Sequence, residues 1–337
     1  MEQNANREYS LDLLRVISCM MVFGVHLGQH ITIPGSVGVF FSKGSTGVGF
    51  FFILSGYLAF VTLERLETRY SSFRLMMVYF WIRKMIRILP LYYLVIAFYF
   101  VFFSITDSVP KDSSGLYWIK YLLFLNTSVQ SDNVFWNNLG AVWSISCFVF
   151  FYLIAPICYK AIRKYWISWG TVIISYGIMK CIDDRQIYNT PIRSLFYFFL
   201  GALAYLAVKE KKEKQIAIFL SILLLFCILT GGGTAIVAPC LAVMYIVVTR
   251  GVTISNKVLF RVINFLSMIS YSIYLDHAAV IEVMDHLKMP HGLMYGGVLI
   301  ASSFILAVIT YNLVEKKFVD LCMGVFCKTF LEKVAKY

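Results

Sequence analysis

Long apolar segments recur along the whole chain and alternate with short polar stretches. About ten of them are long enough to cross the hydrocarbon core of a bilayer, which takes about 20 helical residues. The apolar run between residues 215 and 249 is interrupted only by Gly231-Gly232-Gly233, which predicts a hairpin of two helices. The pattern therefore predicts an all-α, polytopic integral membrane protein. The ten segments lie near residues 11–31, 45–62, 88–106, 139–159, 165–180, 192–208, 215–231, 233–249, 262–283 and 295–314.

Composition supports this class of protein. Of the 337 residues, 60% are hydrophobic and only 14% are charged, whereas soluble domains carry about 25% charged residues. The net charge of +12 does not indicate nucleic acid, because membrane proteins collect lysine and arginine on their cytoplasmic loops. The eight cysteines follow no disulfide or zinc spacing and are typical of small buried hydrophobic residues. We therefore expect a lipid-embedded protein with no nucleic-acid partner and no metal.

The basic residues predict an orientation. With the N-terminus inside, most of the 30 lysines and arginines fall on the cytoplasmic side, which favours ten helices with both termini cytoplasmic. The first residues lack the pattern of a cleaved signal peptide, so the first helix is expected to direct insertion. We expect a single membrane domain over 1–337, with a transmembrane core at about 11–318, a short cytoplasmic tail at 319–337 and a longest outer loop at about 107–138.

The first apolar segment contains three ionisable residues, Asp12, Arg15 and His26. Such residues are costly inside a membrane and indicate a functional site. Arg15 and His26 are eleven residues apart, so on a helix they share one face at a separation of about 16 Å. Asp12 and Arg15, spaced i and i+3, can form an ion pair. The alternative is that Arg15 anchors the helix at the membrane surface and His26 is a satisfied core histidine.

Three cations, Arg83, Lys84 and Arg87, precede Pro90 at the predicted start of the third helix. Their spacing lets them converge on one target. Cations at a helix N-terminus oppose the dipole, a cost that is explained if they bind an anion such as a phosphate. The alternative is an anchor of the kind that sets membrane orientation.

Small and polar residues mark two further helices. Ser55 and Gly56 give the second helix a small-residue surface, which packing alone could explain. Trp143 and Ser144 stand at the outer end of the fourth helix.

Further ionisable residues occur near the C-terminal end. Asp276 and His277 are adjacent, so they point in different directions on a helix and could serve proton transfer or polar packing. Glu315 is interpreted as a solvated charge at the cytoplasmic exit of the last helix.

Seven motifs, in order, resemble the acyltransferase 3 family of membrane-bound O-acyltransferases. The resemblance runs from about Leu11 to Phe318 and implies transfer of an acyl group, usually acetyl, from cytoplasmic acyl-CoA to a hydroxyl of a cell-surface or exported glycan or its lipid-linked precursor. It also implies that the protein is located in the bacterial cell membrane. The motifs are DLLRVISCMMVFGVH, GVGFFFILSGYL, RILPLYY, VWSISCFVFFYLIAP, PIRSLFYFFLGALAY, ISYSIYLDHA and YNLVEKKF.

The resemblance also implies roles for individual residues. The arginine and histidine of the family's first helix correspond to Arg15 and His26, and its basic pair to Lys84 and Arg87, with Arg83 as a substitute for the first. His26 is the expected general base, a role worth about 10² to 10⁴ in rate, or else the residue that carries an acyl intermediate. The expected acyl-CoA site is Arg15, Arg83, Lys84 and Arg87; the expected site-lining residues are Ser55, Trp143, Ser144, Tyr271, Ser272, Asp276 and His277; the remaining motif residues are Asp12, Gly56 and Glu315.

Two positions depart from the family pattern. Many members have glutamate where this chain has Phe148 and aspartate where it has Gly49, and Asp276 is a candidate to compensate. The missing carboxylates leave a second class open, a transporter or flippase for a lipid-linked sugar or exopolysaccharide. Such a protein would use His26, Asp276 and His277 as a proton relay and would not consume acyl-CoA.

Overall fold

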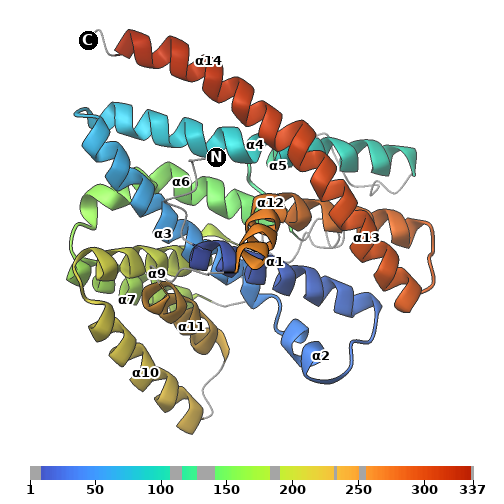
Figure 1. Cartoon of the computed structure of the whole chain (residues 1–337), viewed down its shortest axis with the longest axis horizontal. Coiled ribbons are helices and arrows are strands. Elements are labelled where there is room, and N and C mark those ends of the chain that lie inside the picture. The colour runs from blue at the N-terminus through green and yellow to red at the C-terminus, as the bar shows by residue number, and fades with distance from the viewer. Residues whose placement is uncertain are drawn as a thin grey trace.

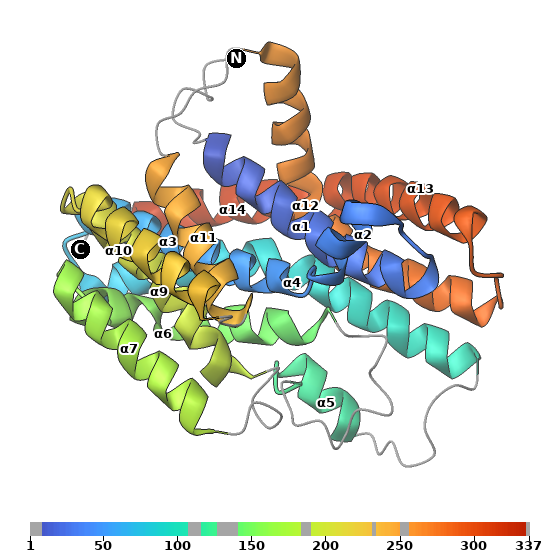
Figure 2. The same ribbon diagram turned by 90° about the horizontal axis from the view of Figure 1, so that it is seen from below.

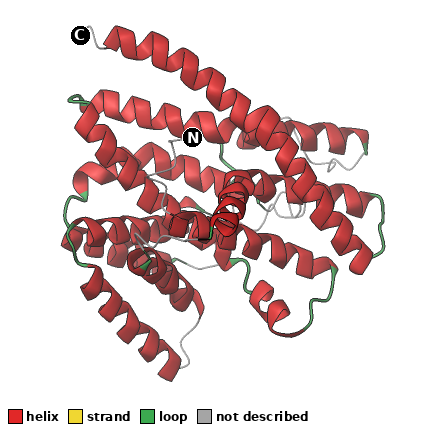
Figure 3. Cartoon of the chain, viewed as in Figure 1, coloured by secondary structure: helices red, strands yellow, loops and turns green. Residues whose placement is uncertain are grey.

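A computed structural model describes residues 9–106, 116–126, 141–182, 190–230, 234–249 and 256–334. In these ranges every regular element is a helix (Figure 3). The elements are α1 (Tyr9–His30), α2 (Gly35–Ser42), α3 (Thr46–Arg69), α4 (Phe73–Ile105), α5 (Leu116–Leu122), α6 (Trp143–Ala161), α7 (Tyr165–Cys181), α9 (Pro191–Lys209), α10 (Glu213–Leu229), α11 (Thr234–Val248), α12 (Lys257–His286), α13 (Leu293–Thr310), the π-helix η2 (Tyr311–Lys316) and α14 (Lys317–Val334).

Each of the ten predicted segments contains a helix. Within the described ranges, seven helices are long and apolar enough to cross a membrane: α1, α3, α4, α6, α9, α12 and the continuous run Leu293–Val325. The helices α7, α10 and α11 have 17, 17 and 15 residues, which is short for a span. The chain is thus an all-helical, multi-pass membrane protein, and the count of ten spans and the side of the termini stay predictions.

Helix lengths differ from expectation at two places. We predicted that the third helix begins near residue 88, but α4 begins at Phe73, because its apolar pattern continues through the intervening cations. Arg83, Lys84 and Arg87 therefore lie in the helix interior, and the argument from an N-terminal dipole is wrong for them. The predicted tail at 319–337 is helical as far as Val334, since α14 continues the α13–η2 run. The outer loop predicted at 107–138 falls mostly outside the described residues.

The helices gather around a central pair. These two helices are α1 and α3, which pack against each other. In Figures 1 and 2, α3 lies with α7, α9, α10 and α11 on one side of the bundle, α13 lies on the other, and α1 lies nearer the centre. The helix α3 packs against α1, α4, α6, α9 and α11, and α1 packs against α12. Side chains on α3 that point into the bundle therefore contact residues from several other helices.

Glycine sets the distance between α3 and α9. A Cβ atom at Gly56 would lie 2.1 Å from the carbonyl oxygen of Phe198, and one at Gly201 would lie 2.0 Å from the carbonyl oxygen of Ile53. Only hydrogen fits at such separations, so both glycines allow the backbones to touch, as small residues do between membrane helices. The packing role expected for Gly56 is confirmed.

Replacing Gly201 by valine should force these two helices apart. Overpacking of this kind costs about 1 to 3 kcal/mol or more, so we expect a lower Tm for the purified protein in detergent. The matched control is Gly170→Ala in α7, where a new Cβ would meet nothing within 4 Å. Equal Tm values for Gly201→Val and wild-type protein would contradict the close contact.

Candidate functional site

A large cationic cavity lies between α1, α3, α4 and the α12–η2–α14 region. Its volume is about 720 Å³. The cavity brings together all four residues predicted to bind acyl-CoA, and it adds Arg65, which the sequence reasoning missed. A polyanion such as a phosphorylated ligand would be attracted to such a cluster. The charged residues that line it are Asp12, Arg15, Arg65, Arg83, Lys84, Arg87 and Glu315.

The Asp12–Arg15 pair is confirmed and has a third member. Nη1 of Arg15 lies 3.1 Å from Oδ1 of Asp12 and donates to Oγ of Ser267 at 2.9 Å, and Ser267 in turn donates to Asp12 at 2.6 Å. Because Ser267 is on α12, this network joins α1 to α12. Ser267 was not predicted; it stands two residues before the motif ISYSIYLDHA, and only the tertiary contact identifies it.

A narrower pocket of about 130 Å³ continues from the cavity into the bundle. It shares Arg15, Leu58, Lys84 and Arg87 with the cavity. Two predicted site-lining residues, Ser55 and Tyr271, border it. The remaining residues that line it are Val48, Phe51, Ile88, Ile145, Phe148, Tyr152, Ser270 and Tyr274.

Aromatic rings position a cation in this inner pocket. Nζ of Lys84 lies 4.8 Å from the ring centre of Tyr152 and 5.4 Å from that of Phe80, within the range of cation–π attraction. Phe148, at the position where many family members have glutamate, contacts the rings of Phe52, Tyr152 and Phe198. A carboxylate at residue 148 would be desolvated among these rings, which is costly. The aromatic surroundings therefore explain why this chain has phenylalanine and not an acid at this position.

His26 and His277 form a hydrogen-bonded pair, with Nδ1 of His26 2.7 Å from Nε2 of His277. Nδ1 of His277 lies 2.9 Å from the carbonyl oxygen of Ile273. A carbonyl only accepts, so neutral His277 carries its proton on Nδ1 and accepts on Nε2. His26 therefore donates from Nδ1 and has its basic lone pair on Nε2, the arrangement of an oriented general base.

The histidine pair lies beside the inner pocket. The ring of Tyr274, which lines that pocket, is 6.3 Å from the ring of His277. Its hydroxyl lies 2.8 Å from Oγ of Ser144. Neither histidine is among the residues that line the pocket. Tyr274 lines the pocket and contacts His277, and Ser144 contacts the same tyrosine.

The two acids near the C-terminal end are buried in separate places. Asp276 accepts from Thr310 at 2.6 Å, so it points away from His277, as the spacing predicted. Glu315 is 4% exposed and accepts a hydrogen bond from Ser272. The expectation of a solvated charge is wrong for Glu315, because the π-helix η2 turns its side chain inward to the cavity and not to solvent.

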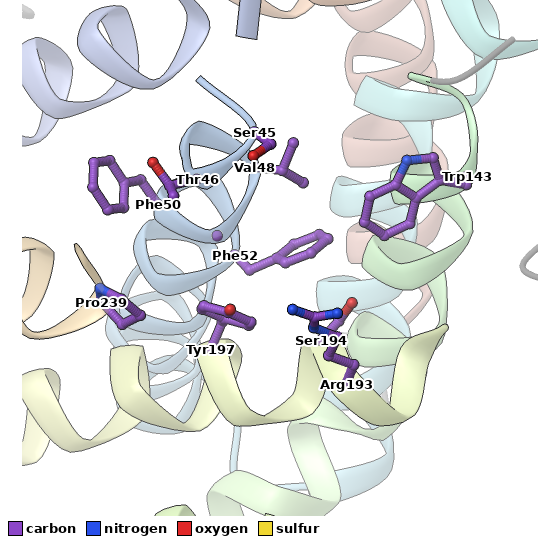
Figure 4. Close-up of a pocket in the computed structure, with 11 residues that line it drawn as sticks. Ser45, Thr46, Val48, Phe50, Phe52, Trp143, Arg193, Ser194, Tyr197 and Pro239 are labelled. Atoms are coloured by element: carbon purple, nitrogen blue, oxygen red, sulfur yellow. The ribbon is translucent and has the colours of Figure 1, made fainter. Parts of the chain in front are cut away.

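A third pocket, of about 70 Å³, lies at the beginning of α3 (Figure 4). Trp143 and Gly49 line it, together with Arg193, Ser194 and Tyr197. It shares Val48 with the inner pocket. Trp143 therefore belongs to this pocket and not to the one bordered by Ser55 and Tyr271. Arg193 lies in the motif PIRSLFYFFLGALAY, a signal that could have identified it.

The three pockets follow α3 from one end to the other. The cavity is bordered by residues as far as Arg65, the inner pocket by Ser55 and Phe51, and the third pocket by Thr46 and Ser45. Twenty helical residues extend about 30 Å, the thickness of a bilayer core. The bundle therefore contains pockets near both ends of α3 and near its middle.

Fold and site together define a multi-pass membrane protein with a cationic interior cavity and, farther along α1, a hydrogen-bonded histidine pair. A family model described as an acyltransferase domain matches residues 8–312, and the chain belongs to the acyltransferase 3 family. It is 24% identical over 359 aligned positions to peptidoglycan O-acetyltransferase OatA of Listeria monocytogenes, an alignment that covers 92% of this chain and 56% of the relative. It is 25% identical over 317 positions to a Staphylococcus aureus protein provisionally named as an O-acetyltransferase, covering 81% and 50%.

The chain thus spans about half the length of the curated relatives it matches. No solved structure matches it.

Removing the carboxylate of Asp12 should destabilise the protein. The side chains of Arg15 and Asp12 are 17% and 8% exposed, and breaking a buried pair from one side costs about 3 to 5 kcal/mol. We expect Asp12→Ala to lower the Tm strongly and the double variant Asp12→Ala/Arg15→Met to recover part of the loss. The control is Lys209→Ala, whose ion pair with Glu64 has side chains 41% and 39% exposed and should contribute about 0 to 1 kcal/mol. Similar losses for Asp12→Ala and Lys209→Ala would be inconsistent with this account.

Proposed function

We propose that this chain is a membrane O-acetyltransferase that moves an acetyl group from acetyl-CoA to a hydroxyl of a surface or exported glycan or its lipid-linked precursor. The observation that carries the proposal is the cationic cavity, which continues into an inner pocket whose wall residue Tyr274 contacts His277, the hydrogen-bond partner of His26. Membership of the acyltransferase 3 family supports the reaction class. The names of the relatives support acetyl as the transferred group.

The donor is proposed to bind from the cytoplasmic side, where the basic loops are expected. Its phosphates contact Arg15, Arg83, Lys84 and Arg87, whose guanidinium and ammonium groups suit phosphate oxygens. The pantetheine arm follows the narrower pocket past Ser55 and delivers the thioester to the histidine pair. Charge binds one end of the donor, and the aromatic walls of the pocket hold the other end.

His26 then acts on the acceptor. Its Nε2 takes the proton of the acceptor hydroxyl as that oxygen attacks the thioester carbonyl. The C–O bond of the ester forms, the C–S bond breaks, and the proton passes from His26 to the departing thiolate of CoA. Throughout the reaction, Nε2 of His277 accepts the hydrogen bond from Nδ1 of His26. His277 thereby orients the base, as a third group does in other nucleophile–base pairs.

The acceptor is proposed to enter through the pocket at the beginning of α3. Trp143 and Tyr197 offer flat surfaces for a sugar ring, and Arg193, Ser45 and Thr46 offer polar contacts. Gly49 borders this pocket, and Phe148 borders the inner pocket, where the acceptor would have to meet the thioester, so one departure from the family pattern lies on the route of the acceptor and the other at the point of transfer. Acceptor choice is therefore the property in which this chain should differ from members that have the two acids.

His26→Ala should lower acetyl transfer by about 10² to 10⁴, the usual contribution of a general base. The assay supplies radiolabelled acetyl-CoA and a panel of surface glycans and lipid-linked precursors to protein in nanodiscs, and follows label and free CoA together. His286→Ala, an exposed histidine on the same helix as His277, is the matched control. Stable label on wild-type protein but not on His26→Ala would favour an acyl-histidine route over direct transfer.

Arg87→Ala should weaken donor binding, because Arg87 lines both the cavity and the inner pocket. A hydrogen bond to a charged group contributes about 1.5 to 3 kcal/mol, so we expect the KM for acetyl-CoA to rise at least about tenfold with a smaller effect on kcat. Lys160→Ala is the control, since Lys160 pairs with Glu67 at 3.0 Å and does not line either pocket. Absence of binding for every acyl-CoA tried would reject the enzyme and direct the next test to sugar or lipid translocation.

A further inference from the structure

Two histidines and an aspartate converge at the end of α1 that is remote from the cationic cavity. His30 is the last residue of α1, Asp285 lies near the end of α12, and His291 lies in the connection between α12 and α13. Each contributes one ligand atom, and the three atoms lie within 4.8 Å of one another. The cluster is separate from the His26–His277 pair and is not used in the mechanism above.

The spacing of these atoms fits a shared metal ion. Nδ1 of His30 is 3.5 Å from Nε2 of His291 and 3.7 Å from Oδ1 of Asp285, and Nε2 of His291 is 3.9 Å from the same oxygen. These separations are long for hydrogen bonds. Ligands at 2.0 to 2.2 Å from one tetrahedral cation are about 3.4 Å apart, so a small inward movement would place all three on a single ion.

The surroundings hold the three groups in place. The ring of Tyr295, which is fully buried, stacks on His30 at 4.9 Å and meets His291 edge-on at 5.2 Å. Its hydroxyl donates to Oδ1 of Asp285 at 2.7 Å. One tyrosine thus contacts every member of the cluster, which is the kind of outer support that orients ligands in metal sites.

From this geometry we propose that His30, Asp285 and His291 bind a divalent cation of the zinc type. Two imidazole nitrogens and one carboxylate oxygen suit zinc and similar transition metals, whereas calcium and magnesium prefer oxygen alone. Three protein ligands leave a fourth tetrahedral position for water or an external ligand. His291 is 57% exposed and Asp285 36% exposed at the side chain, so an ion can enter from solvent.

A cation there would join the two helices that carry the candidate catalytic histidines. His30 follows His26 by one turn on α1, and Asp285 follows His277 by eight residues on α12. The ion would fasten α1 to the α12–α13 connection at the end where His26 and His277 meet. The binding proposal itself does not depend on the acetyltransferase proposal.

The test measures zinc binding to the full-length protein, purified with a tag that contains no histidine. Protein in nanodiscs is dialysed against buffered free Zn²⁺, and bound metal is measured by mass spectrometry; Co²⁺ replaces Zn²⁺ for an absorption spectrum that reports tetrahedral coordination. We expect about one ion per wild-type chain and at least about tenfold weaker binding for His291→Ala and Tyr295→Phe, since loss of a supporting group alone commonly costs 10- to 100-fold. Magnesium at the same concentration should not compete.

Two control variants distinguish this site from the other histidines. His286→Ala and His26→Ala should bind zinc as wild-type protein does. Zinc should also raise the Tm of wild-type protein and leave that of His291→Ala unchanged, while the two proteins should have equal Tm values without metal, because His291 is exposed. Equal zinc binding by wild type and His291→Ala, or loss of binding in His26→Ala alone, would overturn the proposal.

Discussion

The arrangement of the interior depends on one partly buried ion pair. Arg15 carries a full charge inside the bundle, where an uncompensated cation would be costly. Asp12 and Ser267 satisfy it, at 3.1 and 2.9 Å from the same nitrogen. Because Ser267 is on α12, the pair fixes how α1 lies against α12. The same two helices carry His26 and His277, so the contact that neutralises Arg15 helps to hold together the helices on which the histidines meet.

Local spacing predicted the parts of the site that lie within one helix. The i, i+3 spacing of Asp12 and Arg15 predicted their ion pair. The adjacency of Asp276 and His277 predicted that their side chains point in different directions, and they do contact different partners. The convergence of Arg83 and Arg87 on one cavity likewise follows from spacing on a single helix. Helix periodicity is a property of the backbone, so these relations can be derived without knowledge of the neighbouring helices.

Contacts between helices could not be derived in this way. Glu315 was expected in solvent, and the inward turn of η2 buries it against Ser272. The role of Ser267 depends on which face α12 presents to α1. The cluster of His30, Asp285 and His291 joins the end of α1 to the region between α12 and α13. Its two histidines are more than 250 residues apart in the sequence. In each case the interaction partner is chosen by packing, which hydrophobic pattern alone does not specify.

The two positions that depart from the family pattern lie on different helices, Phe148 on α6 and Gly49 near the beginning of α3, and border different pockets. Phe148 lies among rings at 4.9 to 6.2 Å that would desolvate a carboxylate. At Gly49 a new Cβ would be 2.9 Å from the ring of Tyr197. The first replacement extends an apolar cluster, and the second leaves room for a neighbouring ring. Neither residue lines the cationic cavity, although Phe148 borders the inner pocket, which shares Arg15, Lys84 and Arg87 with that cavity. The residues that line the cavity, where the phosphates of the donor are proposed to bind, can therefore stay the same while residues around the other two pockets vary.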